Sequence, residues 1–143
     1  MTDPRGSGAG LAPIEPHLRD ERPPDDAIVV VRGGPIAADK FVEHALRQAR
    51  EYSVAGGPMY SISVSLTVDG WSLDELLAGP LASRSTYAIS TAGRLREGGY
   101  RLLPTYSPPH YDLVLPGGSY HEAEQLLACF GPSQPNPNKR RRR

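Results

Sequence analysis

The clearest pattern in the chain is a strict alternation of hydroxyl and aliphatic side chains over residues 61–68. Successive side chains of a strand point to opposite faces of a sheet, so this pattern predicts a strand with two different faces. The aliphatic face comprises Ile62, Val64, Leu66 and Val68, and the hydroxyl face comprises Ser61, Ser63, Ser65 and Thr67. A solvent-exposed sheet face accounts for the hydroxyl groups. The alternative is a hydroxyl-lined wall of a cleft that orients a polar ligand.

Other patterns predict further strands and four helices. Residues 27–31 form an unbroken aliphatic run, which is typical of a strand covered on both faces. Apolar residues spaced by three and four predict a helix over residues 36–53. Ser-x-x-Glu capping boxes at Ser72 and Ser119 predict where two more helices begin. The remaining predicted elements are strands over residues 85–90, 100–103 and 111–115 and a helix over residues 92–97.

This order of elements predicts an α+β fold, or a small α/β fold, with one mixed sheet of about five strands and helices packed on it. The last two strands are expected to pair as an antiparallel hairpin. The domain is expected to span residues 27–131. Residues 1–26 mix Gly, Pro and acids without clustered hydrophobic residues, which predicts a disordered tail. Residues 132–143 are predicted to form a second, basic tail rich in Pro, Asn and Arg.

The charges are unevenly distributed, although the net charge of the 143 residues is zero. Residues 27–131 carry eight basic and ten acidic side chains. This slight excess of acids argues against a domain that binds nucleic acid by neutralising phosphates. A basic run at the C-terminus can bind nucleic acid or anionic surfaces, or can simply be solvated. This run consists of Lys139, Arg140, Arg141, Arg142 and Arg143.

Several classes of protein are not supported by the sequence. The single cysteine, Cys129, excludes an internal disulfide, and no Cys/His cluster has the spacing of a zinc site. No apolar run approaches the roughly 20 residues of a membrane span, and no signal peptide is recognisable, so we expect a soluble cytoplasmic protein without a metal. Fourteen of the sixteen basic residues are Arg, which together with the Ala, Gly and Pro content indicates a bacterium with a GC-rich genome.

Two places have side chains suited to chemistry. Arg32 ends the first predicted strand and precedes two glycines, so its guanidinium could clamp a phosphate or carboxylate, or could leave the sheet for solvent. The second place is the Pro-stiffened loop over residues 105–112. There His110 could act as a general acid or base oriented by Asp112, and Tyr106 and Tyr111 could bind a ligand. The alternative interpretation of this loop is a stiff hairpin with surface tyrosines.

Arg32 and Ser61-Ile62-Ser63 resemble the arginine and Ser-Thr-Ser positions of ADP-ribosyltransferase folds. The loop that leads into Asp112 lies where that family carries its catalytic acid. The resemblance implies that Arg32 and the serines bind NAD and that Asp112 supports transfer of ADP-ribose. The chain departs from the family pattern by having Ile in the middle position and Asp in place of Glu.

Two hypotheses about function follow. The first is a small cytoplasmic interaction or accessory module that needs no cofactor and contacts a protein partner through the tyrosine-rich loop and the tails. The second is an NAD-dependent ADP-ribosyltransferase-like enzyme or toxin. It would use Arg32, Ser61, Ser63, His110 and Asp112.

Overall fold

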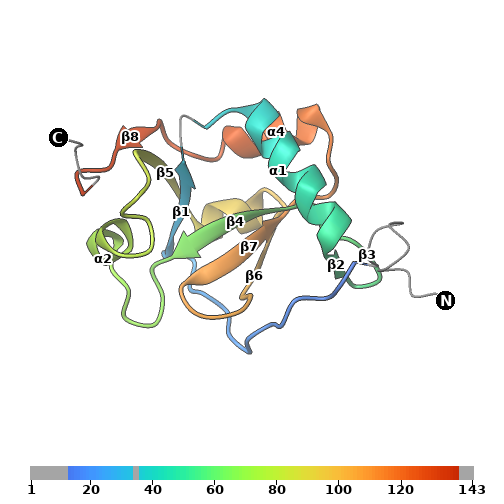
Figure 1. The fold of residues 1–143 in the computed structure, drawn as a ribbon, viewed down its shortest axis with the longest axis horizontal. Coiled ribbons are helices and arrows are strands. Elements are labelled where there is room, and N and C mark those ends of the chain that lie inside the picture. Colours follow the sequence, from blue (N-terminus) through green and yellow to red (C-terminus); the bar gives the residue numbers. More distant parts are fainter. Residues whose placement is uncertain (1–12, 34–35, 139–143) are drawn as a thin grey trace.

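The computed structural model describes residues 13–33 and 36–138, which contain four helices and eight strands (Figure 1). The helices are α1 (Ala38–Glu51), α2 (Leu73–Ala78), α3 (Ala92–Glu97) and α4 (Tyr120–Leu127). The strands are β1 (Ile28–Gly33), β2 (Ser53–Val54), β3 (Gly57–Pro58), β4 (Ser61–Leu66), β5 (Thr86–Thr91), β6 (Arg101–Leu103), β7 (His110–Val114) and β8 (Gln134–Pro135).

Six of these strands form one sheet in the order β6-β7-β4-β1-β5-β8, and every neighbouring pair is antiparallel. The α+β class is therefore confirmed, and so is the antiparallel hairpin of β6 and β7. The sheet differs from the expected one in being antiparallel throughout and in having six strands. The sixth strand, β8, consists of Gln134 and Pro135, a pair too short to show any alternation.

Strand β1 is buried on both faces, as its aliphatic run predicts. Val29 and Val31 face the larger hydrophobic core, and Val30 faces a smaller core that includes Leu76 and Leu77 of α2. The two cores explain why polar residues do not interrupt this strand. Each buried Val contributes about 1.5–3 kcal/mol relative to an exposed side chain.

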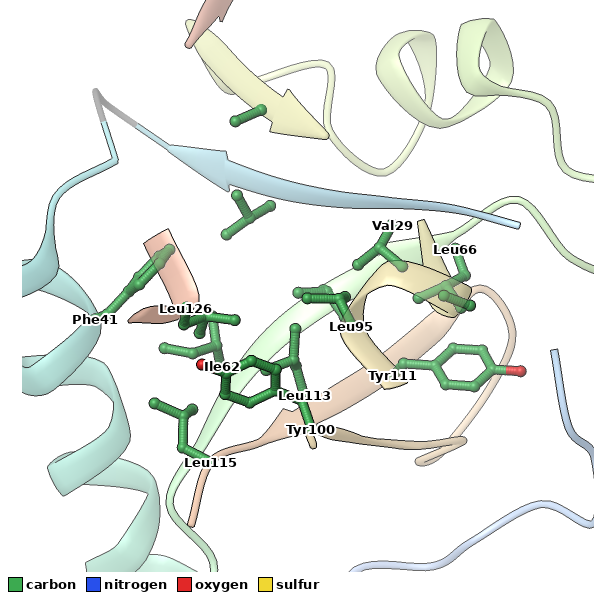
Figure 2. Close-up of a cluster of buried hydrophobic side chains, with 14 of the residues drawn as sticks. Val29, Phe41, Ile62, Leu66, Leu95, Tyr100, Tyr111, Leu113, Leu115 and Leu126 are labelled. Carbon is green, nitrogen blue, oxygen red and sulfur yellow. The ribbon is translucent and has the colours of Figure 1, made fainter. Parts of the chain in front are cut away.

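The larger core lies between the sheet and the helices α1, α3 and α4 (Figure 2). Phe41 of α1 and Leu126 of α4 extend toward Ile62 and Leu113 of the central strands, with Leu95 of α3 beside them. All five side chains are almost completely buried. This cluster fixes the aliphatic face of β4 inward, so the hydroxyl groups of β4 lie on the opposite face.

Both predicted capping boxes are present. The Ser72 Oγ accepts a hydrogen bond from the Glu75 N–H (3.1 Å), and the Glu75 carboxylate accepts one from the Ser72 N–H (2.9 Å). Ser119 and Glu122 form the same reciprocal pair at α4. The two boxes pair backbone donors that would otherwise lack a partner in the first helical turn.

The N-terminal part of the structure differs from the predicted tail. Residues 13–26 lie extended along the domain, and residues 1–12 lie outside the described residues (Figure 1). Ile14 forms a parallel bridge with Tyr52, and Leu18 forms an antiparallel bridge with Thr105. Pro23 is buried. The segment is held because its backbone pairs with existing extended chain, and this needs no cluster of hydrophobic residues in its own sequence.

Part of the predicted C-terminal tail also packs on the domain. Strand β8 pairs with β5, and the next residue, Asn136, is buried. The Asn136 side-chain amide donates to the carbonyl oxygens of Leu77 (3.2 Å) and Leu81 (3.0 Å). The Asn136 side chain thus provides a donor for two backbone carbonyl groups, one in the last turn of α2 and one just after that helix. Residues 139–143 lie outside the described residues.

Candidate functional site

The polar face of β4 and β7 brings together four of the predicted site residues. In the register of these strands, Ser63 lies opposite Asp112 and Ser65 lies opposite His110. Residues directly opposite each other, or two apart, share a face of an antiparallel pair. Ser61, Ser63, His110 and Asp112 therefore lie on one face, opposite to the larger core.

Asp112 is the centre of a buried hydrogen-bond network. Its side chain is held by three donors: its Oδ1 accepts from the Ser61 hydroxyl (3.0 Å) and the Gln48 side-chain amide (3.2 Å), and its Oδ2 accepts from the Thr105 hydroxyl (2.8 Å). Asp112 is 1% exposed, and no ion pair joins it to a described residue. Hydrogen bonds alone thus compensate the burial of this carboxylate.

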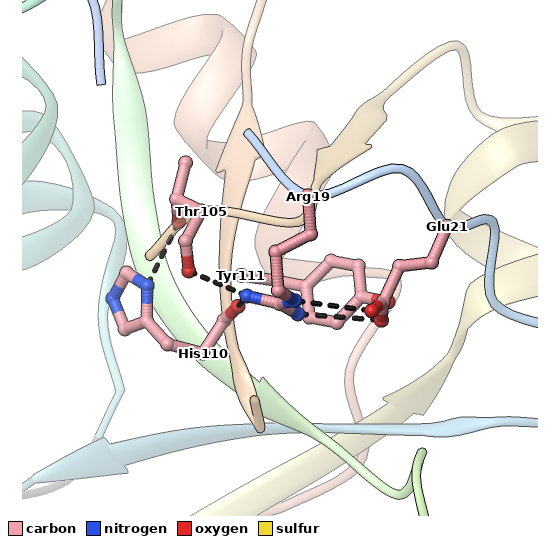
Figure 3. A network of polar contacts seen from close by, with 5 residues as sticks. All are labelled: Arg19, Glu21, Thr105, His110 and Tyr111. Carbon is pink, nitrogen blue, oxygen red and sulfur yellow. Dashed lines mark hydrogen bonds and ion pairs between the residues drawn. The ribbon is translucent and has the colours of Figure 1, made fainter. Parts of the chain in front are cut away.

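The same network orients the His110 ring. The Thr105 Oγ1 lies 2.8 Å from the His110 Nδ1 (Figure 3). The one hydroxyl proton of Thr105 is donated to Asp112, so its oxygen is left to accept from the Nδ1–H of His110. In the neutral ring this leaves Nε2 as an acceptor. The chain from Asp112 through Thr105 to His110 is therefore suited to hold a histidine as a base.

Burial separates the predicted residues into two groups. Ser61, Ser65 and Asp112 are buried, so they can position other groups but cannot contact a bound molecule in this conformation. The hydroxyl face is thus not the solvent-exposed face expected from the alternation. Ser63 and His110 are half-buried and keep some accessible surface.

A second cluster joins the N-terminal segment to the loop (Figure 3). The Arg19 guanidinium donates to the carbonyl oxygens of Thr105 (2.7 Å) and His110 (3.2 Å), the two residues that flank the loop. It also forms an ion pair with Glu21 (3.0 Å) and lies 5.1 Å from the centre of the Tyr111 ring. The Tyr111 hydroxyl donates to the Glu21 carboxylate.

The pKa values in this cluster follow from its contacts. The hydrogen bond from Arg19 lowers the pKa of the Glu21 carboxyl. Burial, followed by the hydrogen bond to Glu21, raises the pKa of the Tyr111 hydroxyl. Tyr111 is fully buried, which corrects its expected role as a ligand-binding residue on the surface. It belongs to the core and anchors the N-terminal segment.

Tyr106 lies above this framework and is 43% exposed. Its ring meets the Tyr52 ring edge-on, with centroids 6.5 Å apart, and lies 5.7 Å from the His110 ring. Its backbone has a φ of 60°, a left-handed conformation that costs energy for any residue other than Gly and that recurs at functional sites. The surrounding contacts therefore hold an aromatic side chain in a fixed, partly exposed position.

Two exposed aliphatic residues of the N-terminal segment pair through their backbones with residues of this region. Ile14 is bridged to Tyr52, and Leu18 is bridged to Thr105, the residue before Tyr106. The two are 54% and 42% exposed. We refer to Ile14, Leu18, Tyr52 and Tyr106 as the aromatic–aliphatic surface.

The structure does not describe the side chains of the remaining predicted residues. Arg32 lies in β1 opposite Tyr87, and its side chain is outside the described part of the structure. The basic run at residues 139–143 is also outside it. Among the described residues, no group of three or more His, Cys, Asp or Glu side chains could hold a metal ion. Within the same part of the chain, no helix has the length and hydrophobicity needed to cross a membrane.

Sequence reasoning missed several residues of the site. Gln48 lies seven residues after Phe41 and three after Ala45, on the buried side of α1, and a polar residue in that position signals a buried hydrogen-bond partner. Arg19, Glu21 and Leu18 had no comparable signal, because an extended segment paired to its neighbour has no periodicity of its own.

The chain matches no model of a known protein family, and comparisons with curated proteins and with solved structures find no match either.

Proposed function

We propose that the protein is a bacterial, cytoplasmic interaction or accessory module that binds a protein partner through the aromatic–aliphatic surface. The observation that carries this proposal is the backbone pairing that brings the exposed residues Ile14 and Leu18 next to Tyr52 and to Thr105, the neighbour of Tyr106. In the described part of the chain, the large apolar residues that are exposed are Ile14, Leu18, Leu46, Tyr106 and Tyr120. Three of these five belong to the aromatic–aliphatic surface. Clustered exposed apolar residues with an aromatic anchor are typical of protein-binding sites.

The framework beneath this surface supports the same proposal. Arg19 holds both ends of the loop that carries Tyr106, and Asp112 and Thr105 hold the loop from below. A surface fixed in this way loses little conformational entropy on binding. A cluster of exposed side chains on a freely moving loop would lose more.

The test is capture of partners from a lysate of the source organism by the wild-type protein and by surface variants. Tyr106→Ala and Leu18→Ala should each reduce recovery of a specific partner by at least about tenfold, which corresponds to the loss of one anchor residue. Tyr120→Ala is the matched control, because Tyr120 is 56% exposed but lies at the start of α4. Equal recovery by all four proteins would contradict the proposal.

A second candidate function is an NAD-dependent ADP-ribosyltransferase-like enzyme. It is supported by the shared face of Ser61, Ser63, His110 and Asp112 and by the oriented His110 ring. Asp112 does not fit the role of a catalytic acid that touches substrate, because it is buried and both of its oxygens are hydrogen-bonded. Ser63 and His110 are the members with surface available to a ligand.

The two candidates are distinguished by ligand-observed NMR with NAD. The enzyme predicts NAD binding that is lost in Arg32→Ala and weakened in His110→Ala. Absence of NAD binding to the wild-type protein would contradict the enzyme and would leave the interaction module unaffected.

A further inference from the structure

The outer edge of β6 is an unpaired strand edge. β6 ends the sheet, with β7 as its neighbour. The Leu115 N–H, just after β7, donates to the Tyr60 carbonyl oxygen, just before β4. The backbone groups of alternate residues in a strand point to opposite neighbours, so Leu113 and Leu115 face β4. Asp112 and Val114 therefore direct their N–H and C=O groups toward β6. Their partners are Leu103 and Arg101, and the N–H and C=O of Leu102 therefore point away from the sheet. No hydrogen bond from a described residue meets either group.

The chain's own N-terminal segment already pairs along this side of the molecule, a few residues further on. The Arg19 N–H donates to the Pro104 carbonyl oxygen (2.7 Å), and the Tyr106 N–H donates to the His17 carbonyl oxygen (3.0 Å). Further along, residues 21–23 of the segment, residues 99–104 and Arg96 line a groove of about 500 Å³.

The groove has an apolar floor and an excess of positive charge. Its lining includes Arg22, Arg96 and Arg101, against one acid, Glu21. Glu21 is already paired with Arg19, and Arg96 is paired with Asp25 (2.6 Å). Arg22 and Arg101 form no ion pair with any described residue. The apolar part of the lining comes from Pro23, Tyr100, Leu102, Leu103 and Pro104.

We propose that this groove binds an extended acidic peptide segment of a partner protein by strand addition to β6. The peptide backbone pairs with the N–H and C=O of Leu102, its apolar side chains lie on the floor, and its carboxylates meet Arg22 and Arg101. Strand addition supplies affinity through main-chain hydrogen bonds and specificity through alternate side chains. A second copy of β6 is disfavoured as the occupant, because antiparallel pairing would bring the arginines of two copies together. The groove shares no residue with the aromatic–aliphatic surface, so peptide binding in the groove does not depend on the proposed function of that surface.

The test is a titration of the full chain with a short synthetic peptide that alternates glutamate and valine, followed by backbone-amide NMR. Binding should shift the Leu102 amide and slow its hydrogen exchange at least about tenfold. Arg22→Glu and Arg101→Glu should each raise the dissociation constant of the peptide about tenfold or more. Arg84→Glu is the control for the change in net charge, because Arg84 is exposed and lies between α2 and β5, outside the groove lining.

Two further probes separate strand addition from simple charge attraction. A peptide with alternate backbone nitrogens methylated keeps its charges but cannot donate to the Leu102 carbonyl, and it should not bind. In the protein, Leu102→Pro removes the outward N–H, which edge strands tolerate, while Leu102→Val keeps it. We expect binding to be lost in Leu102→Pro and retained in Leu102→Val, with the fold of both checked by their amide spectra.

Several outcomes would overturn the proposal. Equal binding of the methylated peptide or of a lysine–valine peptide would exclude strand addition with acidic specificity. If inorganic phosphate displaced the acidic peptide as effectively as unlabelled acidic peptide does, the groove would be a small-anion site instead. No binding of the acidic peptide at millimolar concentration would exclude the site.

Discussion

Replacing Thr105 tests the buried network most sharply, because its one hydroxyl group serves two partners. Thr105 is fully buried, donates to Asp112 and accepts from His110. Thr105→Val keeps the shape of the side chain but leaves the Asp112 carboxylate one donor short and the His110 Nδ1–H without its acceptor. A lost hydrogen bond costs about 1 kcal/mol and an unsatisfied buried polar group about 1–3 kcal/mol, so we expect a loss of about 2–4 kcal/mol. Thr105→Ser keeps the hydroxyl and loses one methyl group, at about 1 kcal/mol.

The assay is urea unfolding of the wild-type protein and both variants. With a slope of about 1.5 kcal/mol per molar urea, Thr105→Val should lower the midpoint of unfolding by roughly 1.3–2.7 M. Nitrogen NMR of His110 gives an independent readout, because loss of the acceptor should change the balance of its two neutral tautomers. The reasoning would be refuted if Thr105→Val and Thr105→Ser were equally stable and His110 were unchanged in both.

Three further predictions concern stability. Since the hydrogen bond from Arg19 lowers the pKa of Glu21 below its ordinary value of 4.5, this carboxyl stabilises the fold above that pH and stops doing so as the pH falls through the folded-state pKa. Glu21→Gln should therefore flatten the decline in the free energy of unfolding that accompanies acidification below the ordinary carboxyl pKa of 4.5. Ser72→Ala should cost about 1 kcal/mol in urea unfolding, through loss of the capping box of α2. Gly93→Ala should destabilise the protein although Ala favours helices, because the new methyl group would lie 2.9 Å from the Asp25 Cβ; wild-type stability in urea unfolding would contradict this.

The parts of the fold that were predictable from the sequence are those with local causes. The helix after Ser72 begins where its capping box predicts, and the helix over residues 92–97 has the expected bounds, because a capping side chain acts within three residues. The aliphatic run of β1 likewise predicted burial on both faces. The order of strands and their antiparallel direction had no such local cause, since they depend on which distant strands pair.

The site was predictable only in part, for similar reasons. Asp112 and His110 could be named as polar residues of a stiff loop, but Thr105 was not distinguished from its neighbours. Tyr111 was wrongly expected to bind a ligand. Its alternation with Leu113 and Leu115 is the period-two pattern of a core-facing residue, and the structure buries it. The contribution of Arg19 depends on contacts across more than 80 positions of the sequence and left no local trace.

The most direct test of the interaction module is site-specific photo-crosslinking in cells of the source organism. A photoreactive phenylalanine analogue is placed at Tyr106 in one protein and at Tyr120 in another, so that both probes replace exposed tyrosines. We predict a discrete crosslinked partner from position 106 that is absent from position 120 and is lost when Leu18→Ala is added. The same products from both positions, or no product from position 106, would contradict the proposed function.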